Sequence, residues 1–166
     1  MKLTLGAATP GDAEAVARLR NAASEDLTRR YGRGHWSSAT SKRGVLRGMS
    51  TTSRVIVARG HDGIIATLRL ATKKPWAIDP AYFTAARKCL YLTDMAVDPA
   101  RQRTGIGRQL LEEAIPVARA WPAEAIRLDA YDADAGAGGF YATCGFREVG
   151  RVIYRKVPLI YYERLV

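Results

Sequence analysis

The chain has 166 residues, which lies within the ~100–200 residues of one domain, so we expect a single domain over residues 1–166. Its 48% apolar and 25% charged residues are typical of a globular protein and exclude a disordered chain. No apolar run approaches the ~18 residues of a membrane helix, and the first residues alternate where a signal peptide would be apolar. We therefore expect a cytoplasmic protein without a membrane span. Two scattered cysteines and two scattered histidines predict neither a disulfide framework nor a metal site.

The net charge of +10 is distributed unevenly along the chain. The interval Leu27–His61 contains no acidic residue and carries a charge of +8. Such a field attracts phosphate, whether on nucleic acid, on a membrane surface or on a phosphorylated cofactor. A basic nucleic-acid-binding module is therefore an alternative function. It is the weaker one, because the sequence has no zinc-finger spacing, no helix-turn-helix signature and no set of closely spaced aromatic residues on a strand.

The first half of the chain reads as a strand, a helix, a loop region and a hairpin. The residues at positions 9–12 have the composition of a helix start, and the β-branched runs before and after Gly60-His61-Asp62-Gly63 indicate a tight hairpin. The predicted elements are a strand over 2–7, a helix from 9 through 20, a loop region over 29–52 with one short helix near 45–49, and hairpin strands over 53–58 and 64–70.

The second half predicts a mixed α/β order. A helix beginning near Gly105 shows an apolar stripe typical of a helix packed on a sheet, and Pro116 should kink or end it. The stripe is formed by Ile106, Leu110, Ala114, Val117 and Trp121. The other predicted elements are strands over 90–97, 125–130, 146–154 and 157–165 and a short helix over 138–144.

The junction between the strand over 90–97 and the following helix is the most informative segment. The first turn of a helix leaves backbone N–H groups unpaired and carries a positive dipole end, so it binds phosphate where the backbone allows close approach. Gly105 and Gly107 allow that approach, and arginines at positions 101, 103 and 108 add positive charge. The loop is neither a Walker A loop, because Arg108 follows Gly107, nor a Rossmann turn, because Leu110 stands where the third glycine belongs.

Two motifs in this half resemble the GNAT superfamily of N-acetyltransferases. Gln102-x-x-Gly105-x-Gly107, after a strand ending in Val97-Asp98-Pro99, resembles its acyl-CoA signature. About 35 residues later, Phe140-Tyr141-x-x-x-Gly145-Phe146 resembles its second motif. The resemblance is specific from about Leu90 to Gly150. It implies an α/β fold with a mixed, largely antiparallel sheet of about six to seven strands flanked by helices, and an enzyme that uses acetyl-CoA.

The resemblance also assigns the residues that bind the cofactor. The backbone of Met95, Ala96 and Val97 would pair with the pantetheine arm like an added strand. The loop that would hold the pyrophosphate consists of Gln102, Arg103, Thr104, Gly105, Ile106, Gly107 and Arg108. Asp134 stands where the family often has an asparagine that touches the cofactor, and a carboxylate can only accept hydrogen bonds there.

The implied reaction is direct attack of a primary amine, on a small molecule or a protein, on the thioester in a ternary complex. Asp94 is the candidate to receive the amine proton, although ordinary pKa values make that transfer about 9 kcal/mol uphill. Tyr141 is the candidate to protonate the thiolate, a transfer about 2 kcal/mol uphill. The alternatives are that Asp94 only orients the backbone or the substrate, that Tyr141 only packs in the core, and that the protein is a non-catalytic CoA-binding sensor.

The segment between the first helix and the second strand is expected to line the acceptor pocket, because the family builds its pocket there. The candidate residues are Tyr31, Arg33, His35 and Trp36. Arg33 would repel a polycation and pair with a carboxylate, so we expect a small-molecule amine with an anionic or aromatic group. A homodimer is common in the family. The apolar segment Leu159–Tyr162 would suit an edge strand for it, though a core strand explains those residues equally well.

Overall fold

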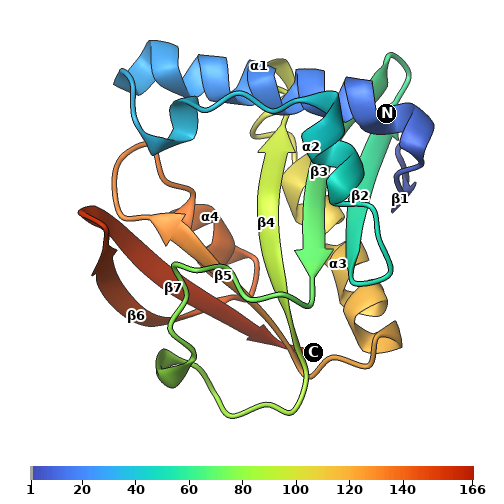
Figure 1. The fold of residues 1–166 in the computed structure, drawn as a ribbon. Helices are drawn as coiled ribbons and strands as arrows, with labels where there is room; N and C mark the ends of the chain where they lie inside the picture. Colours follow the sequence, from blue (N-terminus) through green and yellow to red (C-terminus); the bar gives the residue numbers. More distant parts are fainter. Residues whose placement is uncertain (1) are drawn as a thin grey trace.

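The computed structural model describes residues 2–166, and its seven strands form one sheet. The strands are β1 Thr4–Ala7, β2 Ser53–Gly60, β3 Gly63–Ala71, β4 Cys89–Val97, β5 Ala125–Tyr131, β6 Arg147–Tyr154 and β7 Val157–Leu165, and the helices are α1 Ala13–Tyr31, α2 Lys42–Arg47, α3 Ile106–Ala120 and α4 Gly138–Thr143. The strand order is β1-β2-β3-β4-β5-β7-β6 (Figure 1). The predicted mixed, largely antiparallel sheet flanked by helices is confirmed.

The sheet contains one parallel pair, β4 with β5, and this pair is short. Residues Cys89–Tyr91 pair with Ala125–Arg127, while β4 continues beside β3 as far as Val97. Beyond Tyr91 the two parallel strands diverge (Figure 1). The β3–β4 register shifts at Asp94, whose φ of +55° marks a β-bulge. The outer half of β4 therefore turns an edge toward β5 without pairing with it.

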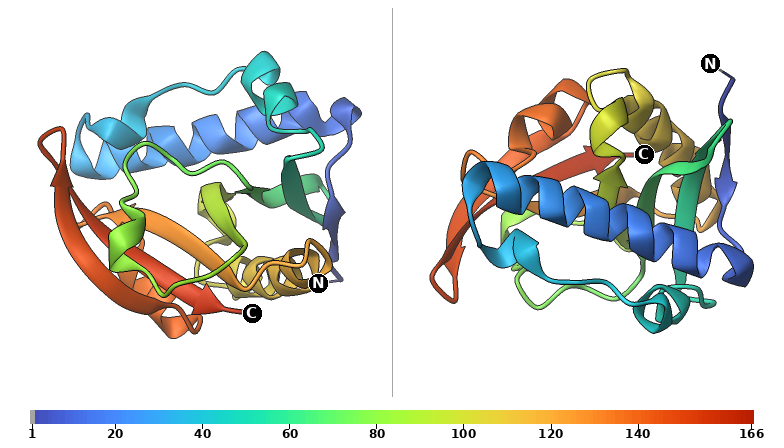
Figure 2. Two further views of the ribbon diagram at one scale, coloured as in Figure 1. Left: turned by 60° about the horizontal axis from the view of Figure 1, so that its bottom comes forward. Right: turned by 90° about the horizontal axis from the view of Figure 1, so that it is seen from above.

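Helices cover both faces of the sheet. Val45 of α2 and the residues Val16 and Ala17 of α1 pack against Val55 and Val57 of β2. The apolar stripe of α3 is buried against the other face, in the largest core cluster, as the spacing predicts. Figure 2 shows α1 and α3 on opposite sides of the strands. The sheet is thus covered on each face, and the divergence of β4 and β5 opens toward the C-terminal half of α1.

Two helices differ from the sequence prediction. Helix α1 continues past Arg20 to Tyr31, supported by a 2.9 Å ion pair between Arg30 and Asp26, so residues 29–31 are helical and not loop. The short helix α2 begins at Lys42, three residues earlier than predicted, because the Ser41 hydroxyl accepts the Gly44 amide at 3.0 Å.

Pro116 does not end α3, which continues to Ala120. Because proline has no N–H, the Glu112 carbonyl lacks its helical hydrogen bond. Both Glu112 and Pro116 are exposed. Water can therefore satisfy the free carbonyl, while the buried side of the helix keeps its packing.

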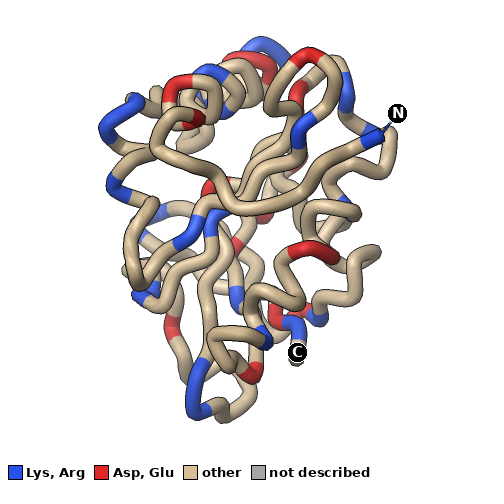
Figure 3. Tube along the Cα trace, turned by 90° about the vertical axis from the view of Figure 1, so that its right-hand side faces the viewer, with Lys and Arg blue, Asp and Glu red and all other residues tan. Residues whose placement is uncertain are grey.

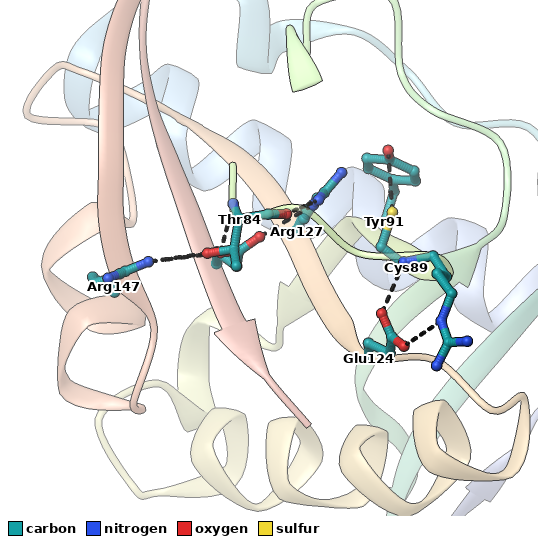
Figure 4. Close-up of polar contacts among 8 residues, drawn as sticks. Thr84, Cys89, Tyr91, Glu124, Arg127 and Arg147 are labelled. Atoms are coloured by element: carbon teal, nitrogen blue, oxygen red, sulfur yellow. Dashed lines mark hydrogen bonds and ion pairs between the residues drawn. The ribbon is translucent and has the colours of Figure 1, made fainter. Parts of the chain in front are cut away.

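A buried ion pair anchors the long connection between β3 and β4 (Figure 4). The Arg127 Nε lies 3.2 Å from a Glu163 oxygen, and both side chains are almost fully buried. The Thr84 carbonyl accepts from Arg127 at 2.6 Å, and its amide donates to Glu163 at 3.2 Å. Arg147 donates to the Thr84 hydroxyl at 3.2 Å. The connection 72–88 is thereby fixed across the sheet.

The segment Leu159–Tyr162 lies in the core. Strand β7 pairs with β5 on one side and β6 on the other, and all four residues are buried. These residues therefore belong to a core strand, as one of the two explanations predicts. The prediction of an edge strand is wrong, because the outer strands of the sheet are β1 and β6.

The acid-free interval does not form a single patch. Arg59 pairs with Asp12 at 2.7 Å, and Arg54 stacks on Trp121 at the end of α3, whereas α2 lies on the opposite face of the sheet. Figure 3 shows lysine and arginine positions on many separate elements. Within residues 2–166, no helix is both long enough and apolar enough to cross a bilayer.

Candidate active site

Two adjoining clefts open where β4 and β5 diverge. The larger has a volume of about 590 Å³ and the smaller about 370 Å³. Met95 and Ala96 of β4 and Tyr141 of α4 line both of them. A molecule in one cleft can therefore meet a molecule in the other at these residues.

The larger cleft brings together most of the residues assigned to the cofactor. Two of the assigned side chains stay outside it: Ile106 is buried in the core, and the Thr104 hydroxyl donates to the Arg101 carbonyl at 2.5 Å. The assigned residues that line the larger cleft are Met95, Ala96, Val97, Gln102, Arg103, Gly105, Gly107, Arg108, Asp134 and Tyr141.

The loop before α3 presents backbone amides to this cleft. Gly105 has a φ of +85°, and α3 begins directly after it. The Gln109 amide reaches back to the Gly105 carbonyl at 3.1 Å, so the amides before it precede the first helical hydrogen bond. Arg103 and Arg108 are exposed beside them. This end of the cleft thus combines free amides, a helix dipole and two guanidiniums, the features with which proteins bind phosphate.

The two glycines of the loop have different roles. Gly105 takes a left-handed backbone conformation that favours glycine, and a Cβ there would meet no atom within 4 Å. Gly107 is packed, since a Cβ on it would lie 3.1 Å from the Phe140 ring and 3.4 Å from the Met95 methyl. The need for a ligand to approach the backbone closely therefore accounts for the glycine at position 105 better than for the glycine at position 107.

The glycine-rich run before α4 also has a packing explanation. A Cβ on Gly136 would lie 1.8 Å from the Tyr131 carbonyl oxygen, and one on Gly138 would lie 2.8 Å from the Tyr162 hydroxyl. Only glycine fits where the chain turns back against β5. This turn places the exposed Asp134 at the larger cleft.

The smaller cleft lies beneath α1 and the segment that follows it. Its wall includes His35 and Trp36, as expected for the acceptor pocket, whereas Tyr31 lines the larger cleft and Arg33 lines neither. The Trp36 ring meets Tyr131 edge-on at 5.8 Å, and its indole N–H donates to the Gly32 carbonyl at 3.0 Å. The aromatic residues are therefore fixed in place as a wall of the cleft.

Asp94 projects from the bulge of β4 into a cluster of cations. Its carboxylate lies 3.1 Å from Arg69 Nε and 4.0 Å from Arg20, and it accepts from the Thr93 hydroxyl at 3.3 Å. All three contacts engage the same carboxylate oxygen and hold the side chain in place. This geometry fits a positioning role for Asp94.

A second carboxylate, Asp129 of β5, lines the smaller cleft. Burial raises its pKa above the ordinary aspartate value. A desolvated carboxylate is a stronger base than an exposed one, and such groups are common at catalytic sites. Sequence reasoning missed this residue. The available signal was an aspartate inside the strand predicted over 125–130, where this residue type is normally depleted.

Tyr141 stands at the junction of the two clefts. Its side chain is buried, and its hydroxyl lies 3.7 Å from the Met95 sulfur. Burial, with a further contribution from the charge of Asp129, raises the pKa of Tyr141. The phenol therefore stays protonated and available as a donor, and its raised pKa makes the transfer to a thiolate more uphill than ordinary pKa values predict.

Neither cysteine lines these clefts. Cys144 is buried in the core, and the Cys89 thiol faces the Tyr91 hydroxyl at 3.4 Å. A covalent acyl-cysteine intermediate has no support in this arrangement.

Comparison with known proteins identifies the family. The sequence model of the Acetyltransferase (GNAT) family matches residues 17–146. An N-acetyltransferase from Staphylococcus aureus Mu50 superimposes with a TM-score of 0.72 and 16% identity, covering 98% of each chain. A ribosomal-protein-alanine N-acetyltransferase from Brucella melitensis gives 0.74 and 17% identity over 98% of this chain and 99% of its own. A Salmonella typhimurium protein solved with its cofactor acetyl-CoA gives 0.72 and 16% identity, over 98% and 93%. The chain therefore belongs to the GNAT family of acetyltransferases, enzymes whose cosubstrate is acetyl-CoA.

Proposed function

We propose that the protein transfers the acetyl group of acetyl-CoA directly to a primary amine, with the cofactor in the larger cleft and the amine in the smaller. The observation that carries this proposal is that the two clefts meet at Tyr141, between the edge of β4 and the desolvated carboxylate of Asp129. A thioester in the larger cleft would lie where an amine from the smaller cleft can reach it.

The larger cleft fits acetyl-CoA along its length. Its phosphate end is the loop before α3, with Arg103 and Arg108. Beyond Tyr91 the edge of β4 is not paired with β5, so its amides and carbonyls are free to bind the pantetheine arm as an added strand. This arrangement leads the thioester toward Tyr141.

Asp129 is the proposed general base. The ordinary aspartate pKa of ~3.9 lies about 6.5 units below the pKa of a primary amine, and desolvation of the carboxylate makes this difference in pKa smaller. The ammonium group gives its proton to the Asp129 carboxylate, and the neutral nitrogen then attacks the thioester carbon. The C–N bond forms, the C–S bond breaks, and the electron pair leaves on sulfur.

Tyr141 is the proposed general acid. The departing thiolate takes the phenolic proton, and the phenolate regains a proton from the acetylated nitrogen, so that the products are the neutral N-acetylated amine and free CoA. The buried hydroxyl has a sulfur, Met95 Sδ, at 3.7 Å as its neighbour. A contact to sulfur is weak, so the hydroxyl is available for a stronger acceptor.

The acceptor is proposed to be a primary amine that the aromatic wall of the smaller cleft can accommodate. Similar structures include acetyltransferases named for ribosomal-protein alanine and for aminoglycosides, so the fold serves very different amines. His35, Trp36 and Tyr131 favour an acceptor with a flat or apolar part.

Turnover on a panel of amines tests the proposal. Acetyl-CoA and protein are mixed with α-amino acids, aromatic amines, aminoglycosides, polyamines and short peptides, and free thiol is measured together with the mass of each amine. We expect thiol release matched by a mass increase of one acetyl group on at least one amine. Acetyl-CoA binding without acetylation of any amine would indicate a CoA-binding sensor instead.

A further inference from the structure

A third cleft, with a volume of about 390 Å³, adjoins the smaller cleft. Asp94 lies on the side of the smaller cleft. We call it the basic cleft. Four of its lining residues are cationic, and none of the described residues that line it is acidic. The cationic residues are Arg47, Arg69, Lys73 and Lys74.

The basic cleft shares a wall with the smaller cleft. Thr93 lines both of them. Arg69 donates to the Thr93 hydroxyl at 3.0 Å and lies 3.1 Å from Asp94, which lines the smaller cleft. A molecule whose amine sits in the smaller cleft can therefore place a distant group in the basic cleft.

Unpartnered buried polar atoms flank this wall. Within residues 2–166, the buried side-chain nitrogen and oxygen atoms without a hydrogen-bond partner are Nε and Nη2 of Arg20 and Oγ of Ser53. Ser53 lines the basic cleft, and Arg20 lines the smaller one. A buried polar atom without a partner is costly, so its occurrence at a cleft points to a partner supplied by a ligand.

The local charge is strongly positive. Arg20 and Arg69 share the single carboxylate of Asp94, and Arg47, Lys73 and Lys74 add three further cations. Among the described residues 2–166, neither Arg47 nor Lys73 forms an ion pair, so their charge is available to a ligand. An excess of fixed positive charge in a concave site attracts an anion.

Two cations of this cleft, Lys74 and Arg69, are held by the fold. Lys74 Nζ donates to the Ile78 carbonyl at 2.7 Å and to the Pro75 carbonyl at 3.0 Å. The stem of Arg69 packs over Gly48, where a Cβ would lie 2.9 Å from Arg69 Cδ. The Asp79 amide donates to the Tyr161 hydroxyl at 3.1 Å, which ties the same connection to β7. Such preorganisation lowers the entropic cost of binding.

We propose that the basic cleft binds an anionic group, a carboxylate or a phosphate, carried by the acceptor amine. The proposal rests on the proposed transfer, because it assigns the far end of the same acceptor. It names Arg47 and Lys73 as residues that determine specificity at a distance from the reacting nitrogen. The Arg69 guanidinium and the unpartnered Ser53 hydroxyl complete the subsite near the shared wall.

Kinetics on matched acceptors tests the subsite. The substrates are linear primary amines of increasing length that end in a carboxylate, a phosphate monoester or an uncharged carboxamide. At saturating acetyl-CoA we expect kcat/KM for an anionic series to exceed that for the carboxamide by about tenfold, as for hydrogen bonds to charged groups. The preference should fall as ionic strength rises. The better of the two anionic series identifies the group.

Variants assign the effect to the cleft. The double substitution Arg47→Gln with Lys73→Gln should abolish the anionic preference. Arg43→Gln is the control, since Arg43 lies on the same helix as Arg47, its substitution also removes a positive charge, and it does not line the cleft. Equal turnover of anionic and neutral acceptors by the unmodified protein, or a preference that survives the double substitution, would overturn the proposal.

A binding measurement separates this proposal from the proposed transfer. Pyrophosphate is titrated into protein saturated with CoA, and the backbone amides of Ser53 and Lys73 are followed by NMR. Shifts in the unmodified protein and in Arg43→Gln, but not in the double variant, support an anion site whether or not any amine is acetylated. Absence of shifts in the unmodified protein overturns it, while acetylation of neutral amines would still uphold the transfer.

Discussion

Asp94 and Asp129 are the same residue type on neighbouring strands, yet their surroundings favour different roles. Asp94 meets Arg69 at 3.1 Å and is half-exposed, whereas Asp129 is desolvated and its pKa is raised. Desolvation makes Asp129 a better proton acceptor, whereas the arginine contacts hold the Asp94 side chain in place. The sequence alone names Asp94 as the candidate to receive the amine proton but cannot show the two arginines beside it, which come from α1 and β3.

The first prediction concerns Asp129. Asp129→Asn keeps the size of the side chain and removes proton acceptance, so kcat should fall by roughly 10²–10⁴-fold, the usual contribution of general base catalysis. The control is Asp132→Asn, since Asp132 pairs with Arg151 and lines neither of the two active-site clefts. A kcat within threefold of the unmodified protein would rule out Asp129 as the base.

The same substitution should stabilise the fold. The folded-state pKa of Asp129 is raised, so its contribution to stability is present below the ordinary value of ~3.9 and is lost as pH rises through the folded-state pKa. At neutral pH the buried charge opposes folding. The Tm of Asp129→Asn should therefore exceed that of the unmodified protein at pH 7, and the difference should disappear near pH 3. A lower Tm at pH 7 would contradict this reading of the site.

A further prediction concerns Tyr141. Tyr141→Phe keeps the ring contacts with Phe140 and Phe146, which lie at centroid distances of 5.4 and 5.7 Å, and removes only the hydroxyl. Turnover should fall by roughly 10²–10⁴-fold while the Kd for acetyl-CoA changes little. Rapid turnover in a correctly folded variant would show that the thiolate leaves without this donor.

At the scale of single elements, the sequence predicts best where the signals are local. The β4–loop–α3 unit was readable because apolar spacing, a proline and two glycines lie within some 20 adjacent residues. The connection 72–88 was not, because its anchors are Glu163 and Tyr161, far along the chain. The second half of α1 was missed because polar residues there conceal a helix that is held by tertiary packing and ion pairs.

The loop before α3 carries its own prediction. Gly105→Ala forces a side chain into a left-handed conformation at a cost of about 1–2 kcal/mol, so the loop should shift and the affinity for CoA should fall several-fold. Gly139→Ala is the control, because its Cβ would meet no atom within 4 Å and its φ is not left-handed. Calorimetric titration with CoA measures both. Equal affinities would show that the backbone of this loop does not hold the phosphates.

At the scale of the whole molecule, the site arises from the divergence of β4 and β5. Pairing over Cys89–Tyr91 holds the strands together at one end, and the bulge at Asp94 bends β4 away at the other. Neither the strand order nor this divergence can be predicted from the local spacing of apolar residues. The strand order depends on long-range pairing, since β7 lies between β5 and β6. The clefts that result are adjacent, so cofactor and acceptor can be bound together.

Direct transfer within such a ternary complex is tested by initial velocities. Acetyl-CoA is varied at several fixed concentrations of the best amine of the panel, and the unmodified protein is also incubated with acetyl-CoA alone and weighed by intact mass spectrometry. The adjoining clefts and the position of both cysteines outside them predict double-reciprocal lines that intersect and a protein that carries no acetyl group. Parallel lines together with an acetylated protein would contradict the account, because they require an acyl-enzyme intermediate.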